Sequence, residues 1–157
     1  MSDYKVPKER ARVRLDLGAA GVVDRILFLS PLAQTHRGRE TVSDLLGSPE
    51  PYLPVLEEGN GLVLLRKDVV RWVRVEEPAE VEWYFYEARL GAPTHRIRCH
   101  FAEGDPLVGI LYAIAPEGEQ RVSDVVNRET GFLPLETDSG LYLVNLKWVT
   151  AIEVVEG

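Results

Sequence analysis

Three residues in the second half of the chain have the side chains of metal ligands. His95, Cys99 and His100 lie close together in the sequence, and imidazole and thiolate groups are common zinc ligands. However, polar and apolar residues alternate over 96–101, which is the pattern of a half-buried strand. Neighbouring residues of a strand point to opposite faces, so Cys99 and His100 cannot both reach one ion. We therefore predict that this cluster binds no metal.

Motifs of the common nucleophile and phosphate-binding enzymes are missing from the sequence. It contains no Gly-x-Ser-x-Gly elbow, no P-loop lysine motif and no Gly-x-Gly-x-x-Gly loop. Adjacent carboxylates occur at Glu57-Glu58 and Glu76-Glu77, where we expect turns or strand ends and hence solvated charges. We predict that the protein is not an enzyme and that it uses no cofactor.

Arginines alternate with apolar residues near the N-terminus, at Arg10, Arg12 and Arg14. Basic side chains often protect the edge of a sheet from unwanted pairing. Guanidinium groups also pair well with phosphate, which would suit a partner or a small anionic ligand such as a nucleotide. This arm resembles the arginine arm of cyclic-dinucleotide-binding barrels of the PilZ type. The Asp/Asn-x-Ser-x-x-Gly motif that completes those sites is missing around Ser43, so both interpretations of the arm stay open.

The charge of the chain is unevenly distributed. Residues 1–77 hold 12 Lys/Arg and 12 Asp/Glu, whereas residues 78–157 hold 6 and 13, which accounts for the net charge of −7. An acidic field opposes the approach of nucleic acid. Binding of nucleic acid through an Sm-like barrel is therefore the function that we favour least.

Two segments of the sequence occur twice, 80 residues apart. Val42-Ser43-Asp44 returns as Val122-Ser123-Asp124, and Tyr52-Leu53-Pro54-Val55 returns as Phe132-Leu133-Pro134-Leu135. The duplication predicts a first repeat over 1–77, which carries the basic arm, and a second repeat over 95–157. A unit of about 65 residues is marginally stable alone, so we expect the repeats to pack on each other or on a second chain.

Each repeat contains about five short runs with strand character, separated by turn residues. Between the second and third runs lies the Val-Ser-Asp motif, where Ser43 and Ser123 suit the N-cap of a helical turn. Gly47 and Asn127 suit a left-handed residue that closes the turn. The sequence thus predicts a mainly β fold of two tandem five-stranded barrels of the SH3 or Sm type, each with one short helical turn.

The segment that joins the repeats, 78–94, is rich in aromatic residues. Trp83, Tyr84, Phe85 and Tyr86 follow one another, and apolar side chains alternate over 81–85. We expect a connecting strand here, or a short amphipathic element, that docks the repeats together. Its aromatic side chains would form either the core between the repeats or a surface for a partner or a second copy, because aromatics are enriched in interface cores.

The motif of the second repeat resembles a group of uncharacterised bacterial proteins. Members carry an Arg-(Leu/Val)-Ser-Asp-x-Leu-Asn stretch followed by a Phe-Leu-x-(Leu/Val) strand, and Arg121 to Asn127 and Phe132 to Leu135 are similar to these. The resemblance implies a small β-rich domain, here in tandem duplicate. It implies no catalytic residue.

Composition suggests where the protein acts and what it does. The sequence has no run of about 20 apolar residues and no signal-peptide pattern near Met1, and its single cysteine cannot form an intramolecular disulfide. We therefore expect a cytoplasmic protein that does not enter the membrane. Because the repeats share turn, cap and core residues but no chemical ones, we predict a non-enzymatic protein-interaction or scaffold module that binds a protein partner or itself.

Overall fold

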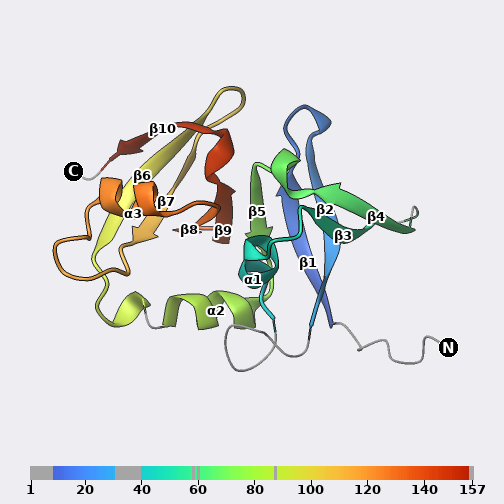
Figure 1. Cartoon of the computed structure of the whole chain (residues 1–157), viewed down its shortest axis with the longest axis horizontal. Coiled ribbons are helices and arrows are strands. Elements are labelled where there is room, and N and C mark those ends of the chain that lie inside the picture. Colours follow the sequence, from blue (N-terminus) through green and yellow to red (C-terminus); the bar gives the residue numbers. More distant parts are fainter. Residues whose placement is uncertain (1–8, 31–39, 58, 60, 87, 156–157) are drawn as a thin grey trace.

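In the computed structural model the described residues form one antiparallel sheet of ten strands (Figure 1). The structure describes residues 9–30, 40–57, 59, 61–86 and 88–155, without the side chains at positions 79, 83 and 89. The strands are β1 (Glu9–Asp16), β2 (Val22–Leu29), β3 (Tyr52–Glu57), β4 (Gly61–Arg66), β5 (Trp72–Val75), β6 (Thr94–Phe101), β7 (Leu107–Tyr112), β8 (Phe132–Thr137), β9 (Gly140–Asn145) and β10 (Val149–Val154). The helices are α1 (Val42–Gly47), α2 (Pro78–Tyr86) and α3 (Val122–Arg128). Short 3-10 turns occur at Gly18–Ala20, Lys67–Val69, Ala88–Leu90 and Leu146–Trp148.

The order of strands in the sheet is β10-β6-β7-β8-β9-β5-β1-β2-β3-β4. The first repeat contributes β1–β5 and the second β6–β10, and within each the order is fifth, first, second, third, fourth. Figure 1 shows the two sets side by side, with β10 and β4 at opposite ends of the molecule. The prediction of a mainly β fold is therefore confirmed.

The prediction of two closed barrels is wrong. Closure would require the fourth strand of each repeat to pair with its own fifth strand. Instead β9 pairs with β5 of the other repeat, from Trp72 opposite Val144 to Val75 opposite Leu141. This pairing, which we call the internal junction, joins the two sets into one open sheet.

In each repeat the ladder between the second and third strands is short. The ladder between β2 and β3 has two residue pairs, and that between β7 and β8 has one, Ile110 opposite Glu136. A Cβ atom at Gly109 would lie 3.0 Å from the carbonyl oxygen of Glu136, so glycine permits this close crossing. Pro54 and Pro134 lie just beyond these short ladders, where the missing N–H has no partner to lose.

The described residues form two apolar cores, one in each repeat. The core of the first repeat includes Leu141 and Leu143 of β9, which come from the second repeat across the internal junction. The core of the second repeat includes Cys99, which is fully buried, as is Leu15 at the equivalent position of the first repeat. Burial raises the pKa of the Cys99 thiol to about 11.

The helical turns α1 and α3 begin two residues earlier than expected. Thr41 is the N-cap of α1, where its hydroxyl accepts the backbone N–H of Asp44 and its own N–H donates to the Asp44 carboxylate. The predicted caps Ser43 and Ser123 thus lie inside the helices. Gly47 and Asn127 do not adopt the left-handed conformation either. Among the described residues, no residue other than glycine has a positive φ, and Gly47 is not one of the glycines that do. Both helices end instead in extended residues.

The joining segment is helical over α2, so of the two elements expected there the connecting strand is wrong. Pro78 suits the first turn of a helix, and Val81 and Phe85 lie one turn apart, so both contact the first core. The carboxylate of Glu80 accepts the buried backbone N–H of Val42 at 2.8 Å and so holds α2 against α1. Among the described residues, no helix has the length and apolar character needed to cross a membrane.

Candidate functional site

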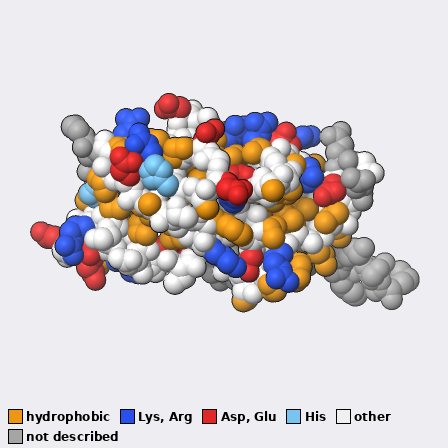
Figure 2. Space-filling view, turned by 90° about the horizontal axis from the view of Figure 1, so that it is seen from above, with side chains coloured by type: hydrophobic (Ala, Val, Ile, Leu, Met, Phe, Trp, Pro, Cys, Tyr) orange, Lys and Arg blue, Asp and Glu red, His pale blue; other side chains and the backbone are white. Residues whose placement is uncertain are grey.

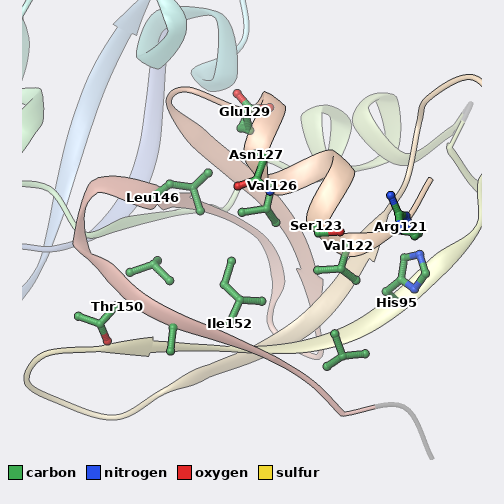
Figure 3. Close-up of a pocket in the computed structure, with 13 residues that line it drawn as sticks. His95, Arg121, Val122, Ser123, Val126, Asn127, Glu129, Leu146, Thr150 and Ile152 are labelled. Carbon is green, nitrogen blue, oxygen red and sulfur yellow. The ribbon is translucent and has the colours of Figure 1, made fainter. Parts of the chain in front are cut away.

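An open groove with an apolar lining lies between α3 and β10. Its volume is about 890 Å³. Figure 3 shows Val122 and Val126 of α3 on one side of the space and Ile152 of β10 on the other. The apolar lining consists of Val122, Val126, Leu146, Val149, Ala151, Ile152 and Val154. We call this the α3–β10 groove.

Local structure explains why these side chains face the groove. Val122 and Val126 are four residues apart in α3, so they lie on one face of the helix. Ile152 and Val154 are two residues apart in β10, so they share one face of the strand. Val122, Val126 and Ile152 are half-buried and Val154 is 52% exposed, so the lining is only partly covered by the described residues.

The equivalent place in the first repeat is filled. Val42 and Leu46 of α1 correspond to Val122 and Val126, and both are buried. Val73 and Val75 of β5 correspond to Ile152 and Val154, and they are also buried. Leu141 and Leu143 of β9 belong to the same core cluster as these four residues. The α3–β10 groove is thus the open counterpart of a site that holds a strand in the first repeat.

The rim of the groove is polar and its charges are mostly paired. The guanidinium of Arg121 lies 3.0 Å from the Asp124 carboxylate, which lowers the pKa of Asp124. The Nε2 of His95 donates to the carbonyl oxygen of Gln120 at 2.9 Å. No group of three or more His, Cys, Asp or Glu side chains in the described part of the chain is placed to hold a metal ion. This arrangement suits binding of an apolar segment with a polar surround.

On the outer face of β10, Glu153 lies between two basic side chains. Its carboxylate is 3.0 Å from His100 Nε2 and 3.0 Å from Arg98 Nη1. The hydrogen bonds from His100 and then Arg98 lower the pKa of Glu153. These contacts tie β10 to β6 and hold the groove wall in place.

The arginines of the predicted anion site lie on one face of β1, at Arg10, Arg12 and Arg14. Arg14 is 2.9 Å from Asp24, which lowers the pKa of that carboxyl, and Arg10 lies over the ring of Phe28 at 5.9 Å. A hollow of about 600 Å³ beside them is lined by as many acidic as basic side chains: Arg12, Arg14, Arg25, Asp24, Glu57 and Glu76. On the face seen in Figure 2, too, Lys and Arg side chains are interspersed with Asp and Glu.

The four aromatic residues of the predicted interface have different environments. Phe85 is fully buried and packs against Tyr84 and Tyr112, with ring centroids 5.2 and 5.3 Å apart. It is therefore a core residue and not an exposed interface. Tyr84 is half-buried, and burial raises its pKa to about 12. Tyr86 is 67% exposed, and the side chain of Trp83 lies outside the described part of the structure.

Sequence reasoning missed the α3–β10 groove because its residues have ordinary core character. The signal lay in comparing the repeats. Where β9 of the second repeat pairs with β5 of the first, their counterparts β4 and β10 lack the equivalent neighbour among the described strands. Comparison of the chain with models of protein families, with curated proteins and with solved structures gives no match. The resemblance to the bacterial group of small β-rich domains stays a prediction.

Proposed function

We propose that this protein is a non-enzymatic interaction module that binds an extended apolar segment of a protein partner. The segment adds as a strand to the edge of β10, and its apolar side chains enter the α3–β10 groove. The observation that supports this most directly is the first repeat, where β9 occupies the equivalent place beside β5. Strand addition to a sheet edge is a common mode of peptide recognition.

The backbone of β10 is suited to accept a further strand. In an antiparallel ladder, hydrogen-bonded pairs alternate with pairs whose N–H and C=O groups point away from each other. Val155 donates to the carbonyl of Arg96, so Glu153 bonds to β6 and the intervening Ile152 and Val154 direct their backbone groups outward. Among the described strands, β10 has a neighbour on one side only. Its outer edge therefore offers backbone donors and acceptors beside an apolar groove.

A synthetic peptide of residues 139–147 tests this function, because it contains the strand that fills the equivalent site. Fluorescence anisotropy of the labelled peptide should show saturable binding. Val154→Lys, which places a charge at the groove and edge, should weaken binding by at least about tenfold. Leu90→Lys is a matched control, since Leu90 is 74% exposed and lies away from the groove. No binding, or equal loss in both variants, would reject the proposal.

A small-ligand or nucleotide sensor that uses Arg10, Arg12 and Arg14 is the alternative function. Arg14 pairs with Asp24, Arg10 lies over the ring of Phe28, and the hollow beside Arg12 carries balanced charge, so a polyanion gains little net attraction there. A panel of nucleotides should leave the melting temperature unchanged, whereas a shift lost in Arg12→Ala would favour the sensor. Sm-like binding of nucleic acid is the least favoured function for the same electrostatic reason.

The finer assignment of the fold is also a proposal. Each repeat keeps five strands in the order fifth, first, second, third, fourth, with a helical turn between the second and third. We regard each repeat as a small unit related in form to SH3 and Sm barrels, opened where the fourth and fifth strands would meet. A cytoplasmic location and the tandem duplication of a bacterial domain are consistent with this proposal.

A further inference from the structure

The internal junction has equivalent positions at the two ends of the molecule. The chain segments Arg66 to Val75 and Asn145 to Val154 align without a gap at an offset of 79 residues. Strand β4 of the first repeat is thus the counterpart of β9, and β10 of the second repeat is the counterpart of β5. In the junction, β9 and β5 pair with each other; at the ends, β4 and β10 each have one described neighbour.

Side chains that the junction buries are exposed on β4. Leu141 and Leu143 are both 0% exposed, because they enter the core of the first repeat. Their counterparts Leu62 and Leu64 are 62% and 64% exposed. Tyr52, at 44% exposure, is likewise the counterpart of Phe132, which packs against the first core. Strand β4 therefore presents the same apolar ridge that β9 inserts into the first repeat.

The residues of β4 that carry the exposed leucine side chains also direct their backbone N–H and C=O groups to the outer edge. Asn145 donates to the carbonyl of Arg71, so Leu143 and Leu141 are the next positions of β9 whose backbone groups face β5. On β4, Lys67 donates to the carbonyl of Pro51, which places Leu65 and Val63 in bonded pairs with β3. The alternating Leu64 and Leu62 consequently direct their backbone groups to the outer edge, as Ile152 and Val154 do on β10.

When the register of the internal junction is applied to β10 and β4, the outward-facing backbone groups of these two strands lie opposite one another. Val73 lies opposite Leu143, and Val75 opposite Leu141. The same register sets Ile152 opposite Leu64, and Val154 opposite Leu62. All four residues point their backbone donors and acceptors toward the new partner strand, and the two leucines reach the α3–β10 groove.

The corners beside the strands differ between the two contacts. In the internal junction, Lys147 Nζ lies 3.0 Å from Asp68 Oδ2. Asp68 and Lys147 are themselves equivalent positions and already pair within each chain, so the contact between copies gains no separate ion pair from them. One contact of the internal junction has no equivalent at the ends. The rings of Trp72 and Tyr142 pack edge-on with centroids 4.9 Å apart, but their counterparts Ala151 and Val63 are not aromatic. The contact at the ends is therefore weaker than the internal one.

We infer that the α3–β10 groove and the β10 edge bind strand β4 of a second copy of this chain. The inference rests on the proposed function and names the partner of the same site. Because β4 and β10 lie at opposite ends of the molecule (Figure 1), one chain cannot join its own ends by this pairing, and copies associate head to tail. Such a contact produces a ring where its rotation closes and a filament where it does not.

Light scattering of the purified full chain over a range of concentrations tests the inference. The wild type should show a mass that rises with concentration to at least twice the 17.6 kDa of one chain. The double variant Leu62→Lys/Leu64→Lys and the single variant Val154→Lys should each have the mass of one chain. All three positions are more than half exposed, so these variants should stay folded, which circular dichroism and thermal unfolding verify. Leu90→Lys is the control and should behave as the wild type.

Mixing the two blocked variants separates head-to-tail pairing from symmetric pairing. Leu62→Lys/Leu64→Lys keeps its groove and Val154→Lys keeps its β4 edge, so the mixture should form a complex of two chains and no larger species. A wild type with the mass of one chain at every concentration would overturn the inference, as would association that the edge variants do not change or a mixture that does not combine. Were the peptide 139–147 still bound by such a single chain, strand binding would stand and only the second copy as partner would be rejected.

Discussion

The first and second repeats build the same apolar site between a helical turn and a fifth strand, but only the first has it covered. In the first repeat, Val42 and Val73 are fully buried beneath β9. In the second, Val122 and Ile152 at the equivalent positions are half-buried and line an open groove. The difference lies not in residue type, which is aliphatic in both, but in whether a neighbouring fourth strand is present.

This comparison shows how a duplicated sequence can acquire a binding site without new chemistry. One fold element, the edge of the fourth strand, serves as core where it has a partner and as exposed surface where it has none. The same leucine positions are therefore structural at 141 and 143 and available for recognition at 62 and 64. Experiments on matched pairs of residues can break or sharpen this contrast.

The largest expected effect is at the buried leucine of the internal junction. Leu143→Ala removes a fully buried side chain from the first core and should lower the free energy of unfolding by about 2 to 5 kcal/mol. Leu64→Ala, at the equivalent exposed position, should change it by about 0.5 kcal/mol or less. Urea unfolding at low protein concentration measures both without a contribution from association. Similar losses at the two positions would mean that β4 is covered in the single chain.

A smaller effect should appear at alkaline pH, and it belongs to the second repeat alone. The pKa of Cys99 is raised by burial from 9.0 to about 11, so the folded chain holds the thiol proton more tightly than the unfolded chain. Stability is unaffected below pH 9 and falls as the pH rises from about 9 to about 11, by up to about 2 to 3 kcal/mol. Leu15 at the equivalent position does not titrate.

The control for this pH dependence is Cys99→Ala. The variant is less stable at neutral pH because it leaves a small cavity, but its stability should fall less steeply between pH 9 and 11 than that of the wild type. The remaining slope includes Tyr84, whose pKa is raised to about 12. Parallel curves for the two proteins would show that the thiol is accessible to solvent in the second core.

The smallest change in stability is expected from substitutions at the last residues of β9 and β4. Asn145 is buried; its side-chain amide donates to the carbonyl of Val70 at 2.9 Å and accepts the N–H of Lys147 at 3.1 Å. Asn145→Ala leaves the Val70 carbonyl without this donor and should cost about 1 to 3 kcal/mol. Arg66→Ala removes an exposed contact with Tyr52 and should cost about 0.5 kcal/mol or less. Thermal unfolding ranks the two, and a reversed order would contradict the equivalence.

Local features of this fold could be predicted from the sequence, and pairings between distant segments could not. Alternation located β1 and β6, since this pattern depends on a few neighbouring residues. The pairing of β5 with β9 joins residues about 70 positions apart. The same alternation of residues would also allow the fifth strand of each repeat to pair with the fourth strand of its own repeat. The groove follows from that choice, so it could not be predicted either.

The aromatic segment shows a second limit. Over 81–85 the apolar residues fit a period of two, but Val81 and Phe85 fit a helical turn equally well. Pro78 and the buried contact of Glu80 with Val42 decide in favour of the helix, and the second of these exists only in the folded chain. Thr41 and Asp44 form the helix cap, although Ser43 also has a residue type preferred there, because the helix starts two residues earlier than expected.

Helix α2 connects the end of β5 to the start of β6, and this covalent link changes the meaning of the two contacts. The internal junction forms within one molecule, so its partner strands meet at a high effective concentration that does not depend on how much protein is present. The contact between β4 and β10 of separate copies has no such tether and obeys mass action. One pairing geometry would thus be permanent inside the chain and adjustable between chains, which makes the abundance of the protein itself the variable that controls its assembly.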